Sequence, residues 1–121
     1  MCMVRVFNQL GDKVGDVTND RDDVVYSQWG YFGGTYPFGS WGCTTSHYRG
    51  FYALLIQVQG VWTSLGVFAT EDEARQVWQE LYDFVEKHKN APMPKQLPEY
   101  HTPRGKNSID AYAVFKSLDN R

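Results

Sequence analysis

Cys43 and His47 are the two residues of this chain whose types and spacing best suit covalent chemistry. A thiol and an imidazole can act as nucleophile and base, but catalysis also needs an orienting group and a donor for the developing oxyanion. The surrounding sequence offers no acid, because Val24–Thr70 contains neither Asp nor Glu. We therefore expect both residues to be structural, and we predict no catalytic residues and no enzyme activity.

Metal and nucleotide motifs are also missing from the sequence. A metal site assembled from Cys43, His47, His88 and His101 would have no CxxC or HxxxH pair to anchor it. The glycines match neither the GxxxxGK[ST] nor the GxGxxG phosphate-binding pattern and are spaced for turns. We predict no metal and no cofactor.

The segment Val24–Thr70 differs in composition from the rest of the chain. It holds twelve of the nineteen aromatic residues, eight of the eleven glycines and a single formal charge, that of Arg49. Such a segment is typical of a sheet that uses one face for the core and the other for a ligand or partner. Its aromatic rings suit the core, a protein interface or stacking on a flat ligand, and all three readings remain open.

We place the predicted binding site in this aromatic segment and at three cations: Trp29, Tyr31, Tyr36, Phe38, Trp41, Arg49, Arg104 and Lys106. A buried, unpaired cation is costly, so we expect Arg49 to pair with Asp22, Asp23 or a helix acid, or else to contact a carbonyl or a bound anion. Arg104 and Lys106 belong to a locally basic tail and are predicted contacts for phosphate or carboxylate.

Length and charge set the outer bounds. The chain has 121 residues and a formal net charge of −2, which fits a single domain spanning 1–121 and disfavours DNA as a partner. It shows neither a secretory leader nor a run of about 20 apolar residues, so we expect a cytoplasmic protein with no membrane contact.

The pattern of residues predicts an α+β fold, in which an antiparallel sheet of about five or six strands packs against one long amphipathic helix, about 71–89, with a short C-terminal helix within Gly105–Leu118. Thr70 and Glu73 form a capping box at the start of the long helix. Strands are expected at Cys2–Phe7, Val24–Tyr31, Phe51–Val58 and Val61–Phe68. The acidic Asn8–Asp23 is expected to be a loop, Phe32–Ser46 a short irregular hairpin or ordered loop, and 91–106 a proline-rich extended segment.

Part of the chain resembles AP2-type and integrase-arm-type DNA-binding modules. The resemblance covers residues 48–81 and rests on Tyr48-Arg49-Gly50, Trp62, Leu65-Gly66-Val67-Phe68 and Thr70-Glu71-Asp72-Glu73-Ala74. It implies a three-stranded antiparallel sheet packed on one helix, with DNA read by Arg and Trp on the exposed sheet face. Neither Phe51–Val58 nor Val61–Phe68 contains Arg or Lys, so an AP2-like DNA-binding regulator is our alternative function.

A looser likeness rests on size, layout and the lack of catalytic residues. In these respects the chain is similar to small phage counter-defence proteins such as CRISPR inhibitors and Thoeris anti-defence sponges. The likeness implies a non-enzymatic inhibitor or sequestering protein that occupies a protein partner or a nucleotide-like ligand through an aromatic, glycine-rich surface. A homo-oligomer is compatible with this interpretation.

Overall fold

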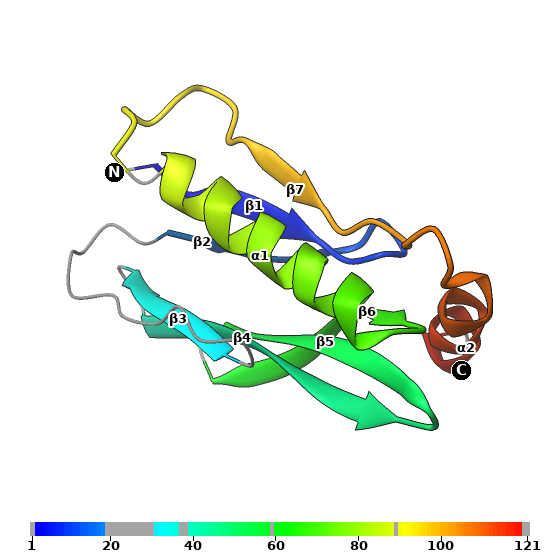
Figure 1. Ribbon diagram of the computed structural model, residues 1–121. Helices are drawn as coiled ribbons and strands as arrows, with labels where there is room; N and C mark the ends of the chain where they lie inside the picture. Colours follow the sequence, from blue (N-terminus) through cyan, green and yellow to red (C-terminus); the bar gives the residue numbers. More distant parts are fainter. Residues whose placement is uncertain (1, 19–30, 37–38, 59, 89, 120–121) are drawn as a thin grey trace.

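The computed structural model describes residues 2–18, 31–36, 39–58, 60–88 and 90–119, with side chains described except in 31–42 and at Asp119 (Figure 1). This part of the chain contains seven strands and two helices. In chain order they are β1 (Val4–Phe7), β2 (Lys13–Val17), β3 (Tyr31–Tyr36), β4 (Gly39–Tyr48), β5 (Phe51–Val58), β6 (Val61–Phe68), α1 (Glu71–His88), β7 (Glu99–His101) and α2 (Ile109–Asp119). The predicted α+β class is confirmed, and so are the long helix and the short C-terminal helix.

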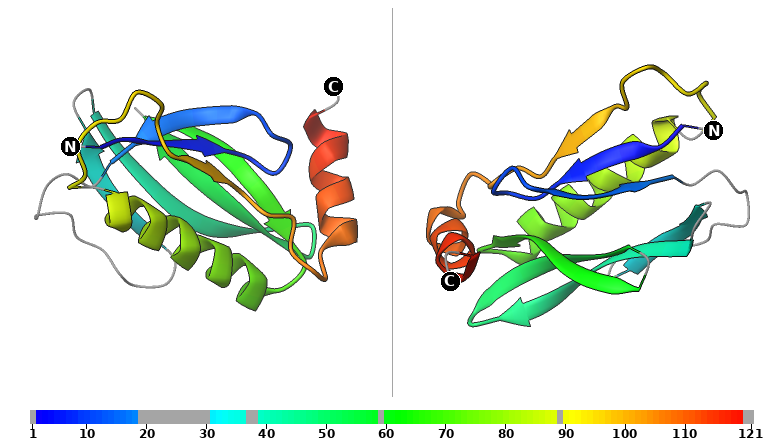
Figure 2. Two further views of the ribbon diagram at one scale, coloured as in Figure 1. Left: turned by 90° about the horizontal axis from the view of Figure 1, so that it is seen from above. Right: turned by 180° about the vertical axis from the view of Figure 1, so that it is seen from behind.

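The strands form two sheets, so the prediction of one antiparallel sheet of five or six strands is wrong. One sheet has the order β2-β1-β7 and the other β3-β4-β5-β6. The second is antiparallel throughout, whereas β1 and β7 pair in parallel. Figures 1 and 2 show the two sheets as separate layers, with α1 along one side of the pair and α2 at one end.

The acidic segment Asn8–Asp23 was expected to be a loop, but part of it forms β2 of the first sheet. Asn8 makes the turn before β2, since its side-chain oxygen accepts from the backbone N–H groups of Leu10 at 2.9 Å and Asp12 at 3.0 Å. The charges on the hairpin are paired across it, with Arg5 Nε 3.2 Å from Asp16 Oδ1. Opposite charges that face each other across two strands stabilise the pairing of those strands.

The expectation of an irregular Phe32–Ser46 is wrong for its described backbone, which belongs to the regular pair β3–β4. Six register pairs join the two strands, and Gly33 lies opposite Gly42. These glycines therefore sit inside strands and not at turns. Of the strand expected at Val24–Tyr31, only Tyr31, the first residue of β3, lies within the described residues.

The main core lies between the two sheets and α1. The predicted apolar stripe of α1 is confirmed, because its buried residues are Ala74, Val77, Trp78, Leu81 and Val85. Opposite it lie Val4 and Val6 of β1 and Leu54 and Ile56 of β5, all fully buried. Burying each side chain of this size stabilises the fold by about 1.5–3 kcal/mol.

A second, smaller cluster lies on the other face of β5 and β6, under α2. It consists of Ala53, Val67, Ala111 and Phe115. The two clusters explain why β5 has apolar residues in consecutive positions, since alternate side chains point to opposite faces of a strand. Leu54 and Ile56 face α1, whereas Ala53 and Leu55 face α2. The prediction that both faces of β5 are largely covered holds for the α1 face, where Leu54 and Ile56 are buried, but only in part for the other face, where Ala53 is buried and Leu55 is half-buried.

Candidate functional site

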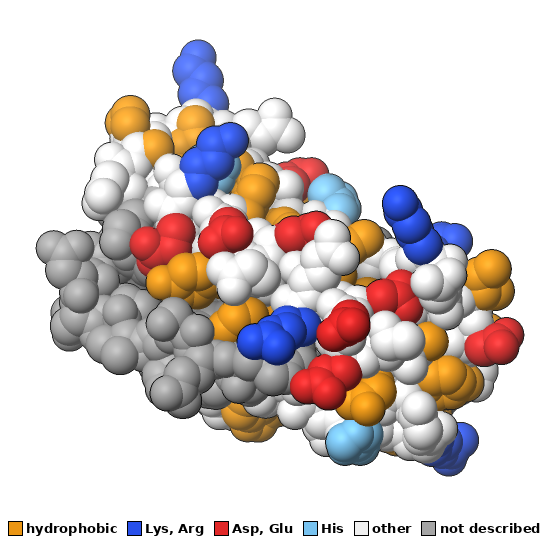
Figure 3. All heavy atoms as spheres, viewed as in Figure 1, with side chains coloured by type: hydrophobic (Ala, Val, Ile, Leu, Met, Phe, Trp, Pro, Cys, Tyr) orange, Lys and Arg blue, Asp and Glu red, His pale blue; other side chains and the backbone are white. Residues whose placement is uncertain are grey.

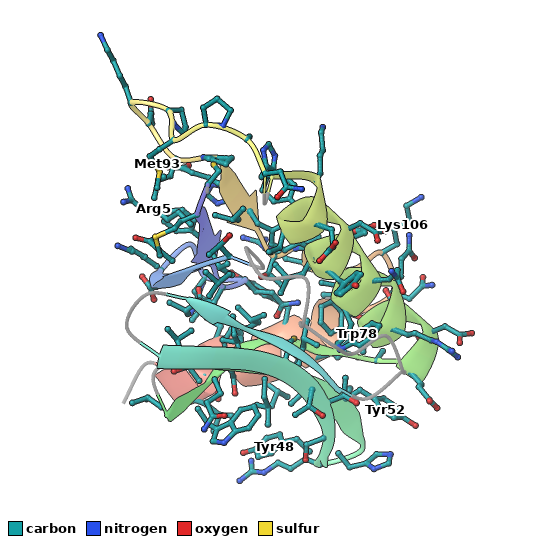
Figure 4. All side chains as sticks on the ribbon, turned by 90° about the vertical axis from the view of Figure 1, so that its left-hand side faces the viewer. Arg5, Tyr48, Tyr52, Trp78, Met93 and Lys106 are labelled. Carbon is teal, nitrogen blue, oxygen red and sulfur yellow. The ribbon has the colours of Figure 1, made fainter. Side chains whose placement is uncertain are left out.

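A groove with a volume of about 580 Å³ lies on the face of β4, β5 and β6 that points away from α1. We call it the outer groove. Its lining residues come from both ends of the chain and from the sheet: Asn8, Ser46, His47, Tyr48, Ala53, Leu55, Thr63, Ser64, Val67, Phe115 and Leu118. Figure 4 shows Tyr48 below the sheet and Trp78 of the main core above it.

The outer groove forms where small side chains lie on neighbouring strands. Ser46 lies opposite Ala53 in the β4–β5 register, and Ser64 lies opposite Leu55 in the β5–β6 register. Because the side chains of Ser46, Ala53 and Ser64 are short, the surface of the sheet is recessed at these positions. The larger side chains of Tyr48 from β4 and Phe115 from α2 stand beside them, which produces a hollow bordered by a strand end and a helix.

A β-bulge in β6 places a polar side chain, that of Ser64, in the groove. The β5–β6 register shifts between Leu54 and Leu55, which places one extra residue in β6. Leu65 is fully buried in the main core, while Ser64 and Val67 both line the groove. The bulge therefore sends the leucine inward and leaves the hydroxyl of Ser64 outside.

The lining of the outer groove contains no Asp, Glu, Lys or Arg among the residues that the structure describes. Its polar groups are hydroxyls and the Asn8 side chain, whereas the His47 ring lies against Tyr52, which packs on the main core on the other face of the sheet. By contrast, Figure 3 shows acidic and basic side chains interspersed along α1. The groove is thus a neutral surface in a chain whose charges are concentrated elsewhere.

Arg49 lies next to the groove, at the turn between β4 and β5. It has a positive φ of 50°, and its guanidinium carbon is 5.4 Å from the centre of the Tyr48 ring. Arg49 is exposed, and within the described residues it forms no ion pair, so no helix acid is its partner. The other two expected partners, Asp22 and Asp23, lie outside the described residues. Water solvates an exposed guanidinium, which removes the cost that prompted the expectation.

The other two predicted cations lie elsewhere. The Arg104 guanidinium carbon is 4.1 Å from the centre of the Tyr112 ring on α2. Lys106 lines a second hollow of about 490 Å³ together with Glu73 and Glu80 of α1. Figure 4 shows Lys106 beside α1, on the other side of the sheet from Tyr48. The structure therefore separates Lys106 from the outer groove.

The predicted aromatic site is not tested by the described residues. Trp29 and Phe38 lie outside them, and so do the side chains of Tyr31, Tyr36 and Trp41. The backbones of Tyr31, Tyr36 and Trp41 are described, with Tyr31 opposite Thr44 in the β3–β4 register. These five residues remain predictions as ligand or partner contacts.

Sequence reasoning missed most of the groove-lining residues, including Tyr48, Leu55, Ser64 and Phe115. A signal was present in β5, where the period-two pattern puts Ala53 and Leu55 on the face opposite Leu54 and Ile56. Apolar residues on the second face of a strand need a cover. The short C-terminal helix was the available element, but its docking position does not follow from local pattern.

Cys43 and His47 do not form a nucleophile–base pair. The side chain of Cys43 is fully buried in the main core, and burial raises the pKa of its thiol far above neutral. His47 is exposed at the end of β4, where its ring centre is 4.7 Å from that of Tyr52. A protonated, buried thiol cannot attack a substrate.

The described histidines and acids do not gather at one place. Over the described stretches of the chain, no group of three or more His, Cys, Asp or Glu residues is placed to hold a metal ion. One histidine–carboxylate contact, His101 Nε2 to Glu99 Oε1 at 3.0 Å, is an exposed pair on β7, with the His101 ring stacked on Phe7.

Of the helices in the described residues, none is long and apolar enough to cross a lipid bilayer. Comparison with known proteins assigns no family: no family model, no curated protein and no solved structure matches the chain.

Proposed function

We propose that this chain is a non-enzymatic binding protein that occupies a protein partner or a nucleotide-like ligand on the face of β4, β5 and β6 that carries the outer groove. The observation that carries the proposal is the groove itself. It is open to solvent, it is built mainly on strands and a helix, with Asn8 from a turn, and it combines aromatic and aliphatic surface with a few hydroxyl groups. Binding sites for small molecules and anchor residues of partners share these properties.

Incomplete covering of this sheet face supports the proposal. α2 covers Ala53 and Val67, but Leu55 is only half-buried and Trp62, on the next row of the same face, is 47% exposed. A large aromatic side chain left in water beside a groove is a common feature of binding surfaces, where Trp and Tyr are enriched. The segment that predicted a binding role from composition thus contributes residues to the groove.

The state of Cys43 further favours binding over catalysis. It is the residue of the segment best suited to nucleophilic chemistry, and its thiol is buried and protonated. The groove lining offers hydroxyls, with no carboxylate among the described residues to orient them. We propose that the protein acts in the cytoplasm by sequestration or inhibition, as phage-type counter-defence proteins do.

DNA binding on the same face has less support. DNA affinity depends on cations that neutralise phosphates, and β5 and β6 contain no Arg or Lys. Among the described residues, Arg49 is the cation at the edge of the groove, where it lies beside Tyr48. The resemblance to AP2-type modules remains a prediction.

The proposal is tested by filling the groove. The variant Ser64→Trp places an indole on the floor, and Ser117→Trp, an exposed position of α2 outside the lining, is the matched control. Ligands released from the heat-denatured protein are identified by mass spectrometry, and partners are captured from a lysate of the organism that carries the gene.

We expect the wild-type chain and Ser117→Trp to retain the same ligand or partner and Ser64→Trp to lose it at an unchanged melting temperature. Retention by Ser64→Trp would place binding elsewhere. Detection of substrate turnover with neither ligand nor partner would overturn the proposal.

A further inference from the structure

We infer that the outer groove takes a small molecule composed of a planar heteroaromatic ring and one anionic group, the chemistry of a nucleoside monophosphate. The ring lies over Leu55 beside Tyr48, and the anionic group lies at Arg49. This inference rests on the proposed function, because it specifies what the groove binds.

The size and shape of the groove favour a small molecule. Its volume of about 580 Å³ falls within the range of about 300–1,000 Å³ that is typical of small-molecule sites. The end of β4 and α2 border the groove on two sides and limit its extent there. A mononucleotide matches these dimensions better than an extended chain.

The lining favours a ring that contains heteroatoms. The half-buried Leu55 offers apolar surface, and Tyr48 offers an aromatic one. Hydroxyls lie beside that surface, and each can donate or accept; on this face of the sheet they belong to Ser46 and Ser64. A hydrocarbon ring would cover these groups without bonding to them, whereas a nucleobase offers donors and acceptors at its edge and a face for stacking.

The charges favour a single anionic group. Arg49 stands over the Tyr48 ring at one end of the groove, and no acid lies in the described lining or anywhere in Val24–Thr70. A guanidinium recognises a phosphate or carboxylate by charge-assisted hydrogen bonds. Additional phosphates would find no further cation on β5 or β6, so a triphosphate gains nothing over a monophosphate.

Arg104 provides a matched control for Arg49. Both are exposed arginines whose guanidinium lies over a tyrosine ring, at 4.1 Å for Arg104 and 5.4 Å for Arg49. Tyr48 lines the outer groove, and Tyr112 does not. The same substitution at the two positions thus separates a role in the groove from the general loss of a surface cation.

The experiment is calorimetric titration of the full chain with AMP, GMP, CMP and UMP, with adenosine and ATP as charge controls. We expect at least one monophosphate to bind, its nucleoside to bind about tenfold more weakly, and ATP to bind no more tightly than AMP. Arg49→Gln lowers monophosphate affinity about tenfold and leaves nucleoside affinity unchanged. Arg104→Gln changes neither, and Ser64→Trp abolishes both.

Two results would overturn the inference. One is the absence of binding by any of these probes at millimolar concentration. The other is an equal loss of affinity in Arg49→Gln and Arg104→Gln. If no probe binds but Ser64→Trp loses a protein partner that Ser117→Trp keeps, the inference fails and the proposed function stands. If the partner is also unaffected by Ser64→Trp, both fail.

Discussion

Glu73 and Ser108 join the first turn of α1 to the start of α2: Glu73 Oε1 accepts a hydrogen bond from Ser108 Oγ at 2.8 Å. The other carboxylate oxygen accepts from the backbone N–H of Asn107 at 3.1 Å, and Ser108 Oγ in turn accepts from the backbone N–H of Ala69 at 2.9 Å. The predicted capping box is therefore only half formed. Glu73 N–H donates to Thr70 Oγ1 at 3.2 Å, but the carboxylate is directed to α2.

The first prediction concerns this junction. Glu73→Ala removes the acceptor for Ser108 and Asn107, and we expect it to lower the free energy of unfolding by about 1–3 kcal/mol. Urea denaturation followed by fluorescence measures the change. Asp72→Ala is the control, since Asp72 is also an acid of the first turn but is exposed and does not take part in the junction with α2. An equal loss in both variants would show that only the helix dipole is involved.

The second prediction concerns Gln9, which covers the edge of β6. Its backbone N–H donates to the Leu65 carbonyl at 2.8 Å, and its side-chain oxygen accepts from the Val67 N–H at 2.9 Å. A Cβ at Gly66 would collide with the Gln9 side chain. We expect Gly66→Ala to destabilise the fold by about 1–3 kcal/mol through overpacking.

A double-mutant cycle tests this contact. Gln9→Ala alone leaves the buried Val67 N–H without its acceptor and costs about 1–3 kcal/mol. In the Gln9→Ala background the collision is gone, so the same Gly66→Ala change should cost much less than in the wild-type chain. Strict additivity of the two losses would contradict the proposed contact.

The third prediction is a loss of stability in alkaline solution. Burial raises the pKa of the Cys43 thiol above its ordinary value of 9.0. Above pH 9 the unfolded chain therefore releases this proton while the folded chain keeps it, and the free energy of unfolding falls by about 1.4 kcal/mol per pH unit for this group. Well below pH 9 the thiol is protonated in both the folded and the unfolded chain, so Cys43 does not make the free energy of unfolding depend on pH.

Urea denaturation between about pH 8 and pH 10 measures the slope, with Cys43→Ala as the comparison. The variant is less stable at every pH because it leaves a cavity, but we expect its slope in the alkaline range to be shallower. Tyr100 gives a similar effect only at higher pH, since burial, Glu80 and Cys43 raise its pKa above an ordinary value of 10.0. Equal slopes in the two proteins would show that folding does not raise the pKa of the Cys43 thiol.

Local pattern predicted the elements whose signals lie within one segment. α1 follows from a capping residue, a helical apolar stripe and basic residues at its end, and the β5–β6 hairpin follows from two apolar runs around Gly60. The partition into two sheets could not be predicted in this way. β1 pairs with β7, which lies near the other end of the chain, and a three-residue strand such as Glu99–His101 carries almost no pattern.

The candidate site shows the same limit. Composition pointed to the segment that contains β4, β5 and β6, and residues of these strands line the outer groove. It did not show which aromatic residues face the groove, since that depends on strand parity and on the bulge at Leu65. It also suggested burial for Arg49, because a lone charge in an uncharged segment gives no sign that it occupies a turn.

The fourth prediction concerns the resemblance to AP2-type modules. A DNA reader on the outer face of the sheet needs several phosphate contacts, and each contributes to a steep salt dependence. β5 and β6 supply no Arg or Lys, and Lys106 lies on the other side of the sheet from Tyr48. We therefore expect a mobility-shift assay with duplex DNA to show no complex at physiological salt.

Any complex at low salt should disappear as salt is raised, and Arg104→Gln should weaken it as much as Arg49→Gln does, because a non-specific complex depends on net charge. The pair of arginine variants is thus the control that separates a specific contact from a general electrostatic one. A complex that survives physiological salt and is lost in Arg49→Gln and Trp62→Ala, but not in Arg104→Gln, would establish DNA reading by this face and displace the ligand-binding proposal.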